Sequence, residues 1–465
     1  MRHFPPTKLG SAGSFWTVFV CGMIVGGFRC PEVIVSPPLW YEDGTYIFGY
    51  YYSNNSLGSI FRLYGYLSLL PNLIGYCLLR LPTEIAYRGF GLVPLILFSL
   101  TCASIASTKS RAIIPNDRIR WVAALGVVLL PFSSLMLVTS VMYSLWNCLL
   151  LLVLMTFWPF PRSIVGRLSF SLIYAVLLCS HPLSLVVAPI LLLRGLLPIA
   201  GSRWPWPAIM IFSFILSLYL TFGFEYRPDH LFIKPLNVLS LLLQYASLQV
   251  VFPTILGEPL LRWLHSEGLD WIAHAASTIL VMSLVAQAIR VYHKDRRATL
   301  GLLILVYLIG TLTILYFFSR SGAESKLFSA APRYFYVQRV LLFLGIIGLL
   351  EKDLNKAQKS LGLRSLFALS MMSWIATLNY FDFGRFSSEL IVRRATEARK
   401  FVNEVLVEEK SLTDPKDIHI VKVRGEHWDI ELAPSREFLD VGDTFFSKWR
   451  ENPSVCPDGW RCVDV

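Results

Sequence analysis

Charged residues are scarce in this chain. Asp, Glu, Lys and Arg make up 16% of its 465 residues, whereas a soluble globular domain has about 25%. Hydrophobic residues make up 55%, and long apolar runs recur along most of the length, which excludes an ordinary soluble fold. Backbone groups inside lipid must bond within helices or a closed barrel. Alternating strands of about 10 residues, the pattern of a membrane barrel, are lacking, so we expect helices.

The pattern of a nucleic-acid-binding surface is also lacking. The net charge is +11, but no basic patch is interleaved with stacking aromatics in a polar segment, so we expect no nucleic-acid partner. We attribute the positive charge to loops that face anionic lipid and the cytoplasm. A small-residue cleavage site is missing after the first apolar stretch, which follows Arg2 and Lys8. We therefore expect a retained first span with the N-terminus in the cytoplasm.

Cysteines are few, and most of the eight lie in apolar runs, where a thiol acts as a small buried hydrophobe. Cys456 and Cys462 differ, because they stand in a polar tail and a Pro-Asp-Gly turn sequence lies between them. This spacing predicts a disulfide on an oxidising side of the membrane. No His or further Cys accompanies the pair, so we expect no metal site there.

Hydropathy predicts an all-α polytopic bundle of about eleven transmembrane helices. The predicted spans are residues 15–28, 90–107, 122–139, 143–158, 168–179, 183–197, 208–224, 271–290, 300–318, 337–350 and 366–381. Residues 236–257 are interrupted by glutamines and a proline, so we expect a re-entrant or interfacial segment on the outer side.

The apolar segment 64–81 is expected to lie along the outer surface as an interfacial helix rather than to cross. If it crossed, a basic group would fall outside, against the positive-inside bias. That group consists of Lys109, Arg111, Arg118 and Arg120.

Two domains are expected. Residues 1–381 form a transmembrane catalytic domain, and residues 382–465 form a small α+β extracytoplasmic domain. Within the second, residues 387–409 have helical periodicity and residues 418–423 alternate like a strand. The predicted protein is integral and multi-pass, in a bacterial inner membrane, with its C-terminus in the periplasm or outside the cell.

An acidic pair, Glu42 and Asp43, follows the first span in a loop rich in Tyr and Trp. Those aromatic residues favour the boundary between water and lipid. Acids held at that boundary are costly unless they serve a function. Our hypothesis is that one of them deprotonates an acceptor hydroxyl beside the outer leaflet. The alternative is a solvated loop with two ordinary acids.

Three short stretches carry a resemblance to a known class. They are residues 41–44 (YEDG), 65–73 (GYLSLLPNL) and 332–337 (PRYFYV). Together with the order of spans, surface helices and outer domain, the chain resembles the GT-C class of membrane glycosyltransferases. The resemblance implies an outer active site that moves a sugar from a polyprenyl-phosphate carrier to an acceptor glycan or lipid. It implies no certain cofactor and leaves a divalent metal, Mg²⁺ or Mn²⁺, open, since some relatives use one.

Displacement at the anomeric carbon needs a base for the acceptor hydroxyl and a cation for the departing phosphate. We expect Asp43 to be the base and Glu42 to orient the sugar or acceptor, although the assignment between them is open. Arg333 is the expected phosphate ligand, because a guanidinium binds two phosphate oxygens at once. Tyr334 and Lys326 are expected beside it. The alternative for Arg333 is an interface arginine that snorkels to water.

Other residues are candidates for the same site. Arg339 is a second candidate for the phosphate, since a charge just inside an apolar run faces a partner or the bundle interior. Tyr66 and Asn72 are expected to line the sugar pocket, or simply to pack the surface helix on the bundle. His181 is expected to bond a sugar or phosphate, or else to be a structural residue of its turn.

Other classes of membrane protein compete with a transferase. A flippase or transporter of lipid-linked sugars would predict inverted halves and paired broken spans at midplane, and neither is evident. A polysaccharide ligase or polymerase with a diphosphate-linked donor shares the phosphate-binding logic. A structural membrane subunit would not need acids at the interface.

Overall fold

The structure, a computed structural model, describes residues 11–40, 43, 47–48, 50–53, 57–61, 67–130, 136–187, 189–190, 235–292, 296–319, 332–354, 392, 395–396, 398–400, 402–403, 419–425, 428–432 and 461–464. These positions are called the described residues. Most of them are helical, as predicted for the apolar part of the chain.

The N-terminal half of the described chain contains α1 (Ser11–Arg29), α2 (Glu32–Val35), α3 (Tyr50–Ser53), η2 (Leu57–Phe61), α4 (Leu69–Leu78), α5 (Thr83–Ala106), η3 (Thr108–Ala112), α6 (Asp117–Leu129), α7 (Met136–Thr139), η4 (Met142–Ser144), α8 (Leu145–Thr156), α9 (Ile164–Leu178) and η5 (Pro182–Val187). The C-terminal half contains α12 (Pro235–Tyr245), the π-helix η7 (Ala246–Val251), α13 (Phe252–Leu256), α14 (Glu258–Ser266), α15 (Asp270–Tyr292), α16 (Arg296–Ser319), η9 (Pro332–Phe335) and α17 (Tyr336–Leu354).

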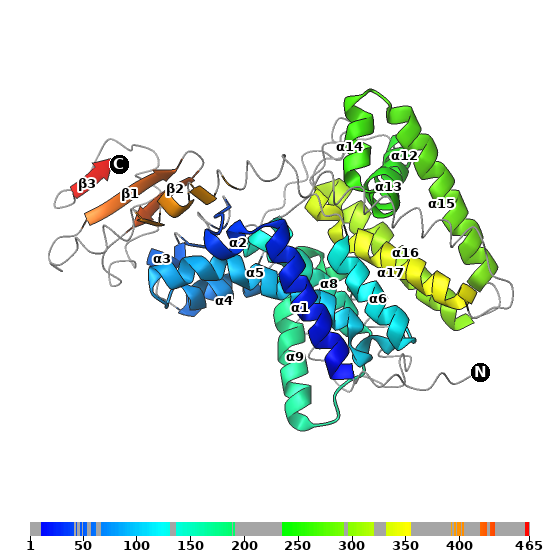
Figure 1. Cartoon of the computed structure of the whole chain (residues 1–465), viewed down its shortest axis with the longest axis horizontal. Coiled ribbons are helices and arrows are strands. Elements are labelled where there is room, and N and C mark those ends of the chain that lie inside the picture. Colours follow the sequence, from blue (N-terminus) through cyan, green and yellow to red (C-terminus); the bar gives the residue numbers. More distant parts are fainter. Residues whose placement is uncertain are drawn as a thin grey trace.

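Small residues let α1 and α5 pack closely. A Cβ at Gly26 would overlap Leu95 Cδ1, and a Cβ at Gly22 would lie 2.9 Å from Ser99 Oγ. The two helices therefore pack backbone against backbone, and α5 also contacts α6, α7 and α8. Figure 1 shows α1–α9 grouped apart from α12–α16.

Helix α17 joins these groups. It contacts α6 and α8 of the first group and α13, α15 and α16 of the second. Its residues Val337 and Val340 belong to the main hydrophobic cluster, which runs through α5, α6 and α8. Phe335, which ends η9, packs instead in a second cluster with residues of α12–α15. The start of α17 is therefore packed against both groups of helices.

One helix among the described residues, α5, is long and apolar enough to cross a membrane by length and composition. Shorter apolar segments lie in α1, α4, α8, α9, α15, α16 and α17. The helical character of the predicted bundle is confirmed in the described residues, while the prediction of about eleven spans stays a prediction. Spans 208–224 and 366–381 lie outside the described residues.

Three predicted segments differ from the observed helices in extent. α5 begins at Thr83, whereas the span was predicted from residue 90, because hydropathy does not detect the polar first turns, which contain Glu84 and Arg88. α4 has ten residues and is about 15 Å long, too short for a bilayer core of about 30 Å. The prediction that this segment does not cross stays a prediction, because α8, a predicted span, is only two residues longer than α4. Residues 236–257 are continuously helical through α12, η7 and α13, up to Gly257 at φ 87°.

A three-stranded sheet forms near the C-terminus, in the order β2-β1-β3. β1 (His419–Gly425) pairs antiparallel with β2 (Trp428–Leu432) and parallel with β3 (Arg461–Asp464). β1 covers most of the segment predicted as a strand. In the predicted helix 387–409, the described residues are helical. The predicted boundary at residue 382 and Cys456 of the predicted disulfide lie outside the described residues, whereas Cys462 lies in β3 opposite Ile420.

Candidate functional site

Trp146, in the first turn of α8, is the centre of an aromatic group with His181 and Tyr334. Its ring meets the His181 ring edge-on, with centroids 4.5 Å apart, and meets the Tyr334 ring in the same way at 5.5 Å. His181 lies in the turn between α9 and η5, and Tyr334 lies in η9. Two candidates from distant parts of the sequence thus meet on one buried indole. We call this part of the bundle the aromatic end.

The His181 imidazole is neutral and has a defined tautomer. Its Nδ1 accepts a hydrogen bond of 2.9 Å from the backbone N–H of Leu183, so the ring proton is on Nε2. Burial lowers the pKa of His181 to about 3. Within the described residues, Nε2 makes no hydrogen bond. His181 therefore offers an N–H donor without positive charge.

Asp43 is attached to the same end. Its carboxylate is fully buried, and Oδ1 accepts a 2.8 Å hydrogen bond from the backbone N–H of Met142, the first residue of η4. η4 leads directly into α8. Trp40 strengthens the attachment, because its Nε1–H donates to Thr139 Oγ1 at 2.8 Å. Asp43 is thus held at the N-terminus of the helical segment that carries Trp146, where a helix favours negative charge.

The surface helix α4 contacts the turn that carries His181. The backbone N–H of Leu70 donates to Ser180 Oγ at 2.9 Å, and that of Leu69 donates to the Cys179 carbonyl at 3.4 Å. The predicted pocket residue Asn72 is fully buried, and its Nδ2 donates to the Ile60 carbonyl at 3.0 Å. Stretch 65–73 therefore reaches the aromatic end through the residues before His181.

Arg339 lies on α17, and its guanidinium is bound by protein groups. Nη1 donates to Glu258 Oε2 at 2.6 Å and Nε donates to the Gln249 carbonyl at 2.8 Å, in a pair that is almost fully buried. Nη2 lies 3.4 Å from Gln249 Oε1. Glu258 also accepts from Arg262. A phosphate bound by Arg339 would have to compete with a buried carboxylate.

Several candidates fall outside what the structure describes. Glu42, Tyr66 and Lys326 are outside the described residues, and the Arg333 side chain is not described although its backbone lies in η9. Their predicted roles stay predictions. Within the described residues, no group of three or more His, Cys, Asp and Glu side chains could hold a metal ion.

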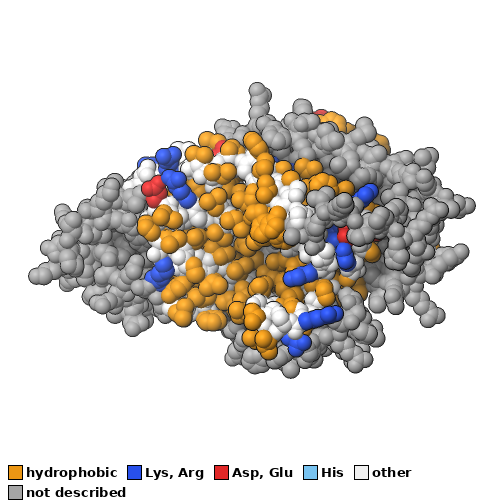
Figure 2. Space-filling model, turned by 60° about the horizontal axis from the view of Figure 1, so that its bottom comes forward, with side chains coloured by type: hydrophobic (Ala, Val, Ile, Leu, Met, Phe, Trp, Pro, Cys, Tyr) orange, Lys and Arg blue, Asp and Glu red, His pale blue; other side chains and the backbone are white. Residues whose placement is uncertain are grey.

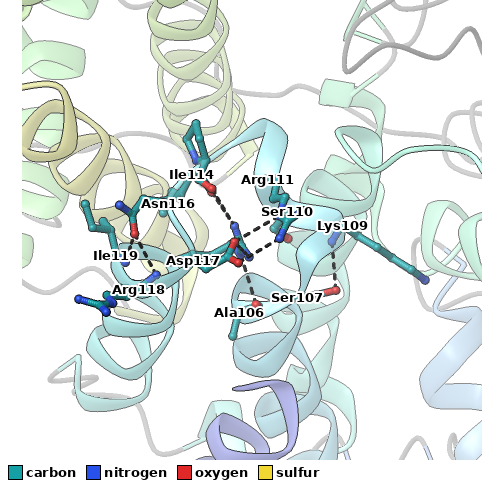
Figure 3. A network of polar contacts seen from close by, with 12 residues as sticks. Ala106, Ser107, Lys109, Ser110, Arg111, Ile114, Asn116, Asp117, Arg118 and Ile119 are labelled. Carbon is teal, nitrogen blue, oxygen red and sulfur yellow. Dashed lines mark hydrogen bonds and ion pairs between the residues drawn. The ribbon is translucent and has the colours of Figure 1, made fainter. Parts of the chain in front are cut away.

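The opposite end of α5 and α8 is basic. Arg120 is buried there; its Nη1 donates to the Ile114 carbonyl at 2.9 Å and its Nη2 to Asp117 Oδ1 at 2.7 Å. Asp117 also pairs with Arg111, in the network of Figure 3. These Arg side chains lower the pKa of the Asp117 carboxyl, the Arg111 hydrogen bond most of all. We call this the basic end.

Further contacts show that α8 and α17 run from one end to the other. Trp158, just after α8, donates from Nε1 to Ser110 Oγ at 3.0 Å, and Lys109 lies over its ring. Glu351, near the end of α17, accepts from the backbone N–H of Asn116 at 3.0 Å. The predicted outer residues Asp43, His181 and Tyr334 are therefore at one end of these helices, and the predicted inner charges are at the other.

Two buried polar residues near the aromatic end were not predicted as candidates. Gln338 is in the first turn of α17, four residues after Tyr334 of η9, and neither of its amide atoms has a hydrogen-bond partner among the described residues. Ser68, just before α4, is also fully buried with its hydroxyl unbonded there. The sequence around these two residues could not have identified them, because the lack of a hydrogen-bond partner depends on how the folded chain packs.

Comparison with family models, with curated proteins and with solved structures gives no match for this chain.

Proposed function

We propose that this chain is a polytopic membrane glycosyltransferase that uses a polyprenyl-phosphate sugar at the outer face of the membrane. Support for the membrane comes first from α1. Its exposed residues Trp16, Val20, Ile24 and Phe28 are spaced four apart and make one apolar stripe. α9 exposes Ile164, Val165, Leu168 and Leu172, and α15 exposes Trp271, Ile279, Met282 and Ile289. Large exposed apolar surfaces mark contact with lipid or a partner.

Figure 2 shows one face of the molecule on which hydrophobic side chains gather broadly, with Lys and Arg near its margins. This distribution suits a bundle in lipid, where cations lie at the headgroups. The positive-inside bias assigns the basic end to the cytoplasm. In the proposed topology the aromatic end is on the outer side.

The observation that carries the proposed activity is the convergence of three sequence stretches on one helix start. Stretch 41–44 reaches it through Asp43 and Met142, and stretch 332–337 through Tyr334 and Trp146. Stretch 65–73 reaches the adjoining turn through Leu70 and Ser180. The stretches that resemble GT-C motifs are far apart in the sequence, and a shared site is the simplest reason for all of them to meet.

The proposed reaction is built from the groups at this end. The Asp43 carboxylate takes the proton of the acceptor hydroxyl, whose oxygen attacks the anomeric carbon. The bond from that carbon to the phosphate oxygen breaks, and polyprenyl phosphate leaves with the electron pair. Arg333 balances the phosphate charge.

The test uses cells that depend on this chain, with lipid mass spectrometry and glycan profiling. Asp43→Asn keeps an oxygen acceptor for the Met142 N–H and removes the base. We expect the lipid-linked donor to accumulate and transfer to fall by about a hundredfold or more, the usual contribution of a general base. Glu84→Gln is the matched control, since the Glu84 side chain is 60% exposed and pairs with Arg88 in the next helical turn.

Unchanged glycans with a stable Asp43→Asn protein would show that Asp43 is not the base. A second assay places the purified wild-type protein in liposomes with lipid-linked sugars. Release of polyprenyl phosphate supports the transferase, and release of polyprenyl diphosphate supports a ligase or polymerase. Transfer of intact lipid-linked sugar across the bilayer supports a flippase. Addition of EDTA decides whether Mg²⁺ or Mn²⁺ is required.

A further inference from the structure

Gln338 is the buried polar side chain that the fold explains least. It is 0% exposed, and both its amide oxygen and its amide nitrogen have no hydrogen-bond partner among the described residues. An amide that leaves water without a partner is unfavourable, so buried amides are normally bonded. A methionine of similar volume would need no hydrogen-bond partner at this position. The glutamine therefore points to a partner that the described residues do not supply.

The position of Gln338 relates it to the aromatic group. Gln338 is in the first turn of α17, which follows η9 directly, and it comes four residues after Tyr334, whose ring contacts Trp146. Gly345, two helical turns further on, is on the same face of α17 as Gln338, and a Cβ there would overlap Leu305 of α16. α16 also binds the segment after His181, because Tyr307 donates from its hydroxyl to the Val186 carbonyl at 3.1 Å. Gln338 is thus on the face of α17 that packs on α16. The same helix α16 contacts η5, the segment that follows His181, through the bond from Tyr307 to Val186.

Two more groups at this end have unused hydrogen-bonding capacity within the described residues. Ser68 is fully buried. It directly precedes Leu69 and Leu70, whose backbone N–H groups donate to the Cys179 carbonyl and to Ser180 Oγ. His181 keeps its Nε2–H unbonded. A carboxamide, a hydroxyl and a neutral imidazole supply donors and acceptors without net charge, beside aromatic rings. That combination suits hydroxyl groups, which both donate and accept, better than it suits a phosphate.

We infer that Gln338, with Ser68 and His181, binds the hydroxyl groups of the sugar, and that Trp146 and Tyr334 provide the apolar wall of this subsite. The inference rests on the proposed function and extends it, because it assigns the sugar to a neutral subsite separate from the cationic phosphate site. It makes these residues determinants of which sugar is used. They hold the substrate and take no part in proton transfer.

The test measures binding without turnover, with Asp43→Asn as the background. The probes are citronellyl phosphate and its phosphodiesters with mannose, glucose, galactose, N-acetylglucosamine and arabinose. The contribution of the sugar is the ratio of the dissociation constants of citronellyl phosphate and the best phosphodiester. We expect Gln338→Met to reduce this ratio by about tenfold, the effect of losing hydrogen bonds from one buried side chain. Binding of citronellyl phosphate itself should not change.

Ser277→Ala is the matched control. Ser277 is also buried with an unbonded hydroxyl among the described residues, but it lies on α15 and outside the aromatic group. It should leave the ratio unchanged. If a trapped water satisfies Gln338, Gln338→Met will leave the ratio unchanged too, and the inference is wrong. It is also wrong if no sugar in the panel improves on citronellyl phosphate.

These outcomes are distinct from failure of the proposed function. If Gln338→Met lowers the sugar contribution while wild-type protein releases no polyprenyl phosphate in liposomes, the subsite stands and the transferase proposal fails. If wild-type protein releases polyprenyl phosphate while Gln338→Met binds every phosphodiester normally, the transferase stands and the subsite fails. Thermal unfolding of Gln338→Met provides a further check, because removal of an unbonded amide should not lower the melting temperature.

Discussion

Asp43 Oδ1 accepts a hydrogen bond from the backbone N–H of Met142, 2.8 Å away, across 99 residues of sequence. This bond caps the helical segment η4–α8 from another part of the chain. Asp43→Ala removes the cap, and loss of a helix cap costs about 1–2 kcal/mol. We expect a corresponding loss in the free energy of unfolding, measured by thermal or denaturant unfolding of the purified protein in detergent.

Asp43→Asn separates stability from activity. The amide oxygen still accepts from the Met142 N–H, so this variant should keep most of the stability that Asp43→Ala loses. Transfer activity should be lost in both variants. Equal stability of the alanine variant and the wild type would mean that the bond to Met142 does not hold the loop. An active asparagine variant would leave Asp43 with the capping role alone.

His181 predicts a dependence of stability on pH. Its pKa is about 3 in the folded state because of burial, whereas in the unfolded chain it is about 6.5. Between these values the unfolded chain binds the additional proton, so the free energy of unfolding falls as the pH falls below about 6.5, and the stabilisation is fully present above that pH. From pH 7 to pH 5 the loss attributable to His181 is about 2 kcal/mol.

His181→Asn is the control for this prediction. Its Oδ1 replaces Nδ1 as the acceptor for the Leu183 N–H, and it does not titrate. Thermal unfolding measured at pH 7 and pH 5 should show a larger drop in melting temperature for the wild type than for His181→Asn. Parallel curves for the two proteins would mean that the imidazole is accessible to protons in the folded state.

The apolar runs predicted much of the fold, because a run of helix-forming residues long enough to enter a membrane has few other structures available. The helices α1, α15, α16 and α17 therefore lie close to their predicted bounds. Asp43, His181 and Tyr334 lie at the start of the segment η4–α8, and their roles in a site stay predictions.

Pairings between distant residues could not be predicted. Glu258 was not a candidate, and its bond to Arg339 depends on how α14 packs against α17. Trp146 is buried between His181 and Tyr334, and no pattern around it in the sequence predicts these two neighbours. Sequence periodicity shows which face of a helix is apolar, but it does not show which other helix packs on that face. Contacts between distant residues are therefore seen only in the folded chain.

The Arg339–Glu258 ion pair predicts a strong dependence of stability on both partners. Each side chain is about 5% exposed, and Glu258→Leu takes the counterion from the buried Arg339 charge, at a cost of about 3–5 kcal/mol. Glu258→Leu alone should therefore destabilise the protein severely, and Arg339→Met less so, because Glu258 keeps its pair with Arg262. The double variant Arg339→Met with Glu258→Leu should recover much of the loss, because an apolar pair often replaces a buried ion pair without penalty.

The exposed pair Arg88–Glu84 is the control, with both side chains 60% exposed. Its removal should cost less than about 1 kcal/mol. Binding of citronellyl phosphate to the double variant then decides the role of Arg339. Its guanidinium is engaged by Glu258 and Gln249, so we expect phosphate binding to be retained. A loss of phosphate binding in a stable double variant would instead make Arg339 a phosphate ligand.

Gly75 predicts how tightly α4 must pack on the segment that follows Asp43. A Cβ at this position would overlap Ile47 Cγ2 and lie 3.1 Å from Tyr51 Cδ2. Both side chains are buried in one cluster, so neither can move away freely. Gly75→Ala should cost about 1–3 kcal/mol, the usual effect of overpacking, and should lower transfer activity because α4 also holds the His181 turn.

Gly310→Ala in α16 provides the opposite expectation. A Cβ there meets no atom within 4 Å among the described residues, so the substitution adds helix propensity without a clash and should stabilise by about 1 kcal/mol. Thermal unfolding of both variants gives the comparison. A Gly75→Ala protein as stable as Gly310→Ala would mean that α4 can move away from Ile47. In that case, the contact between α4 and the turn before His181 could not be what fixes the site.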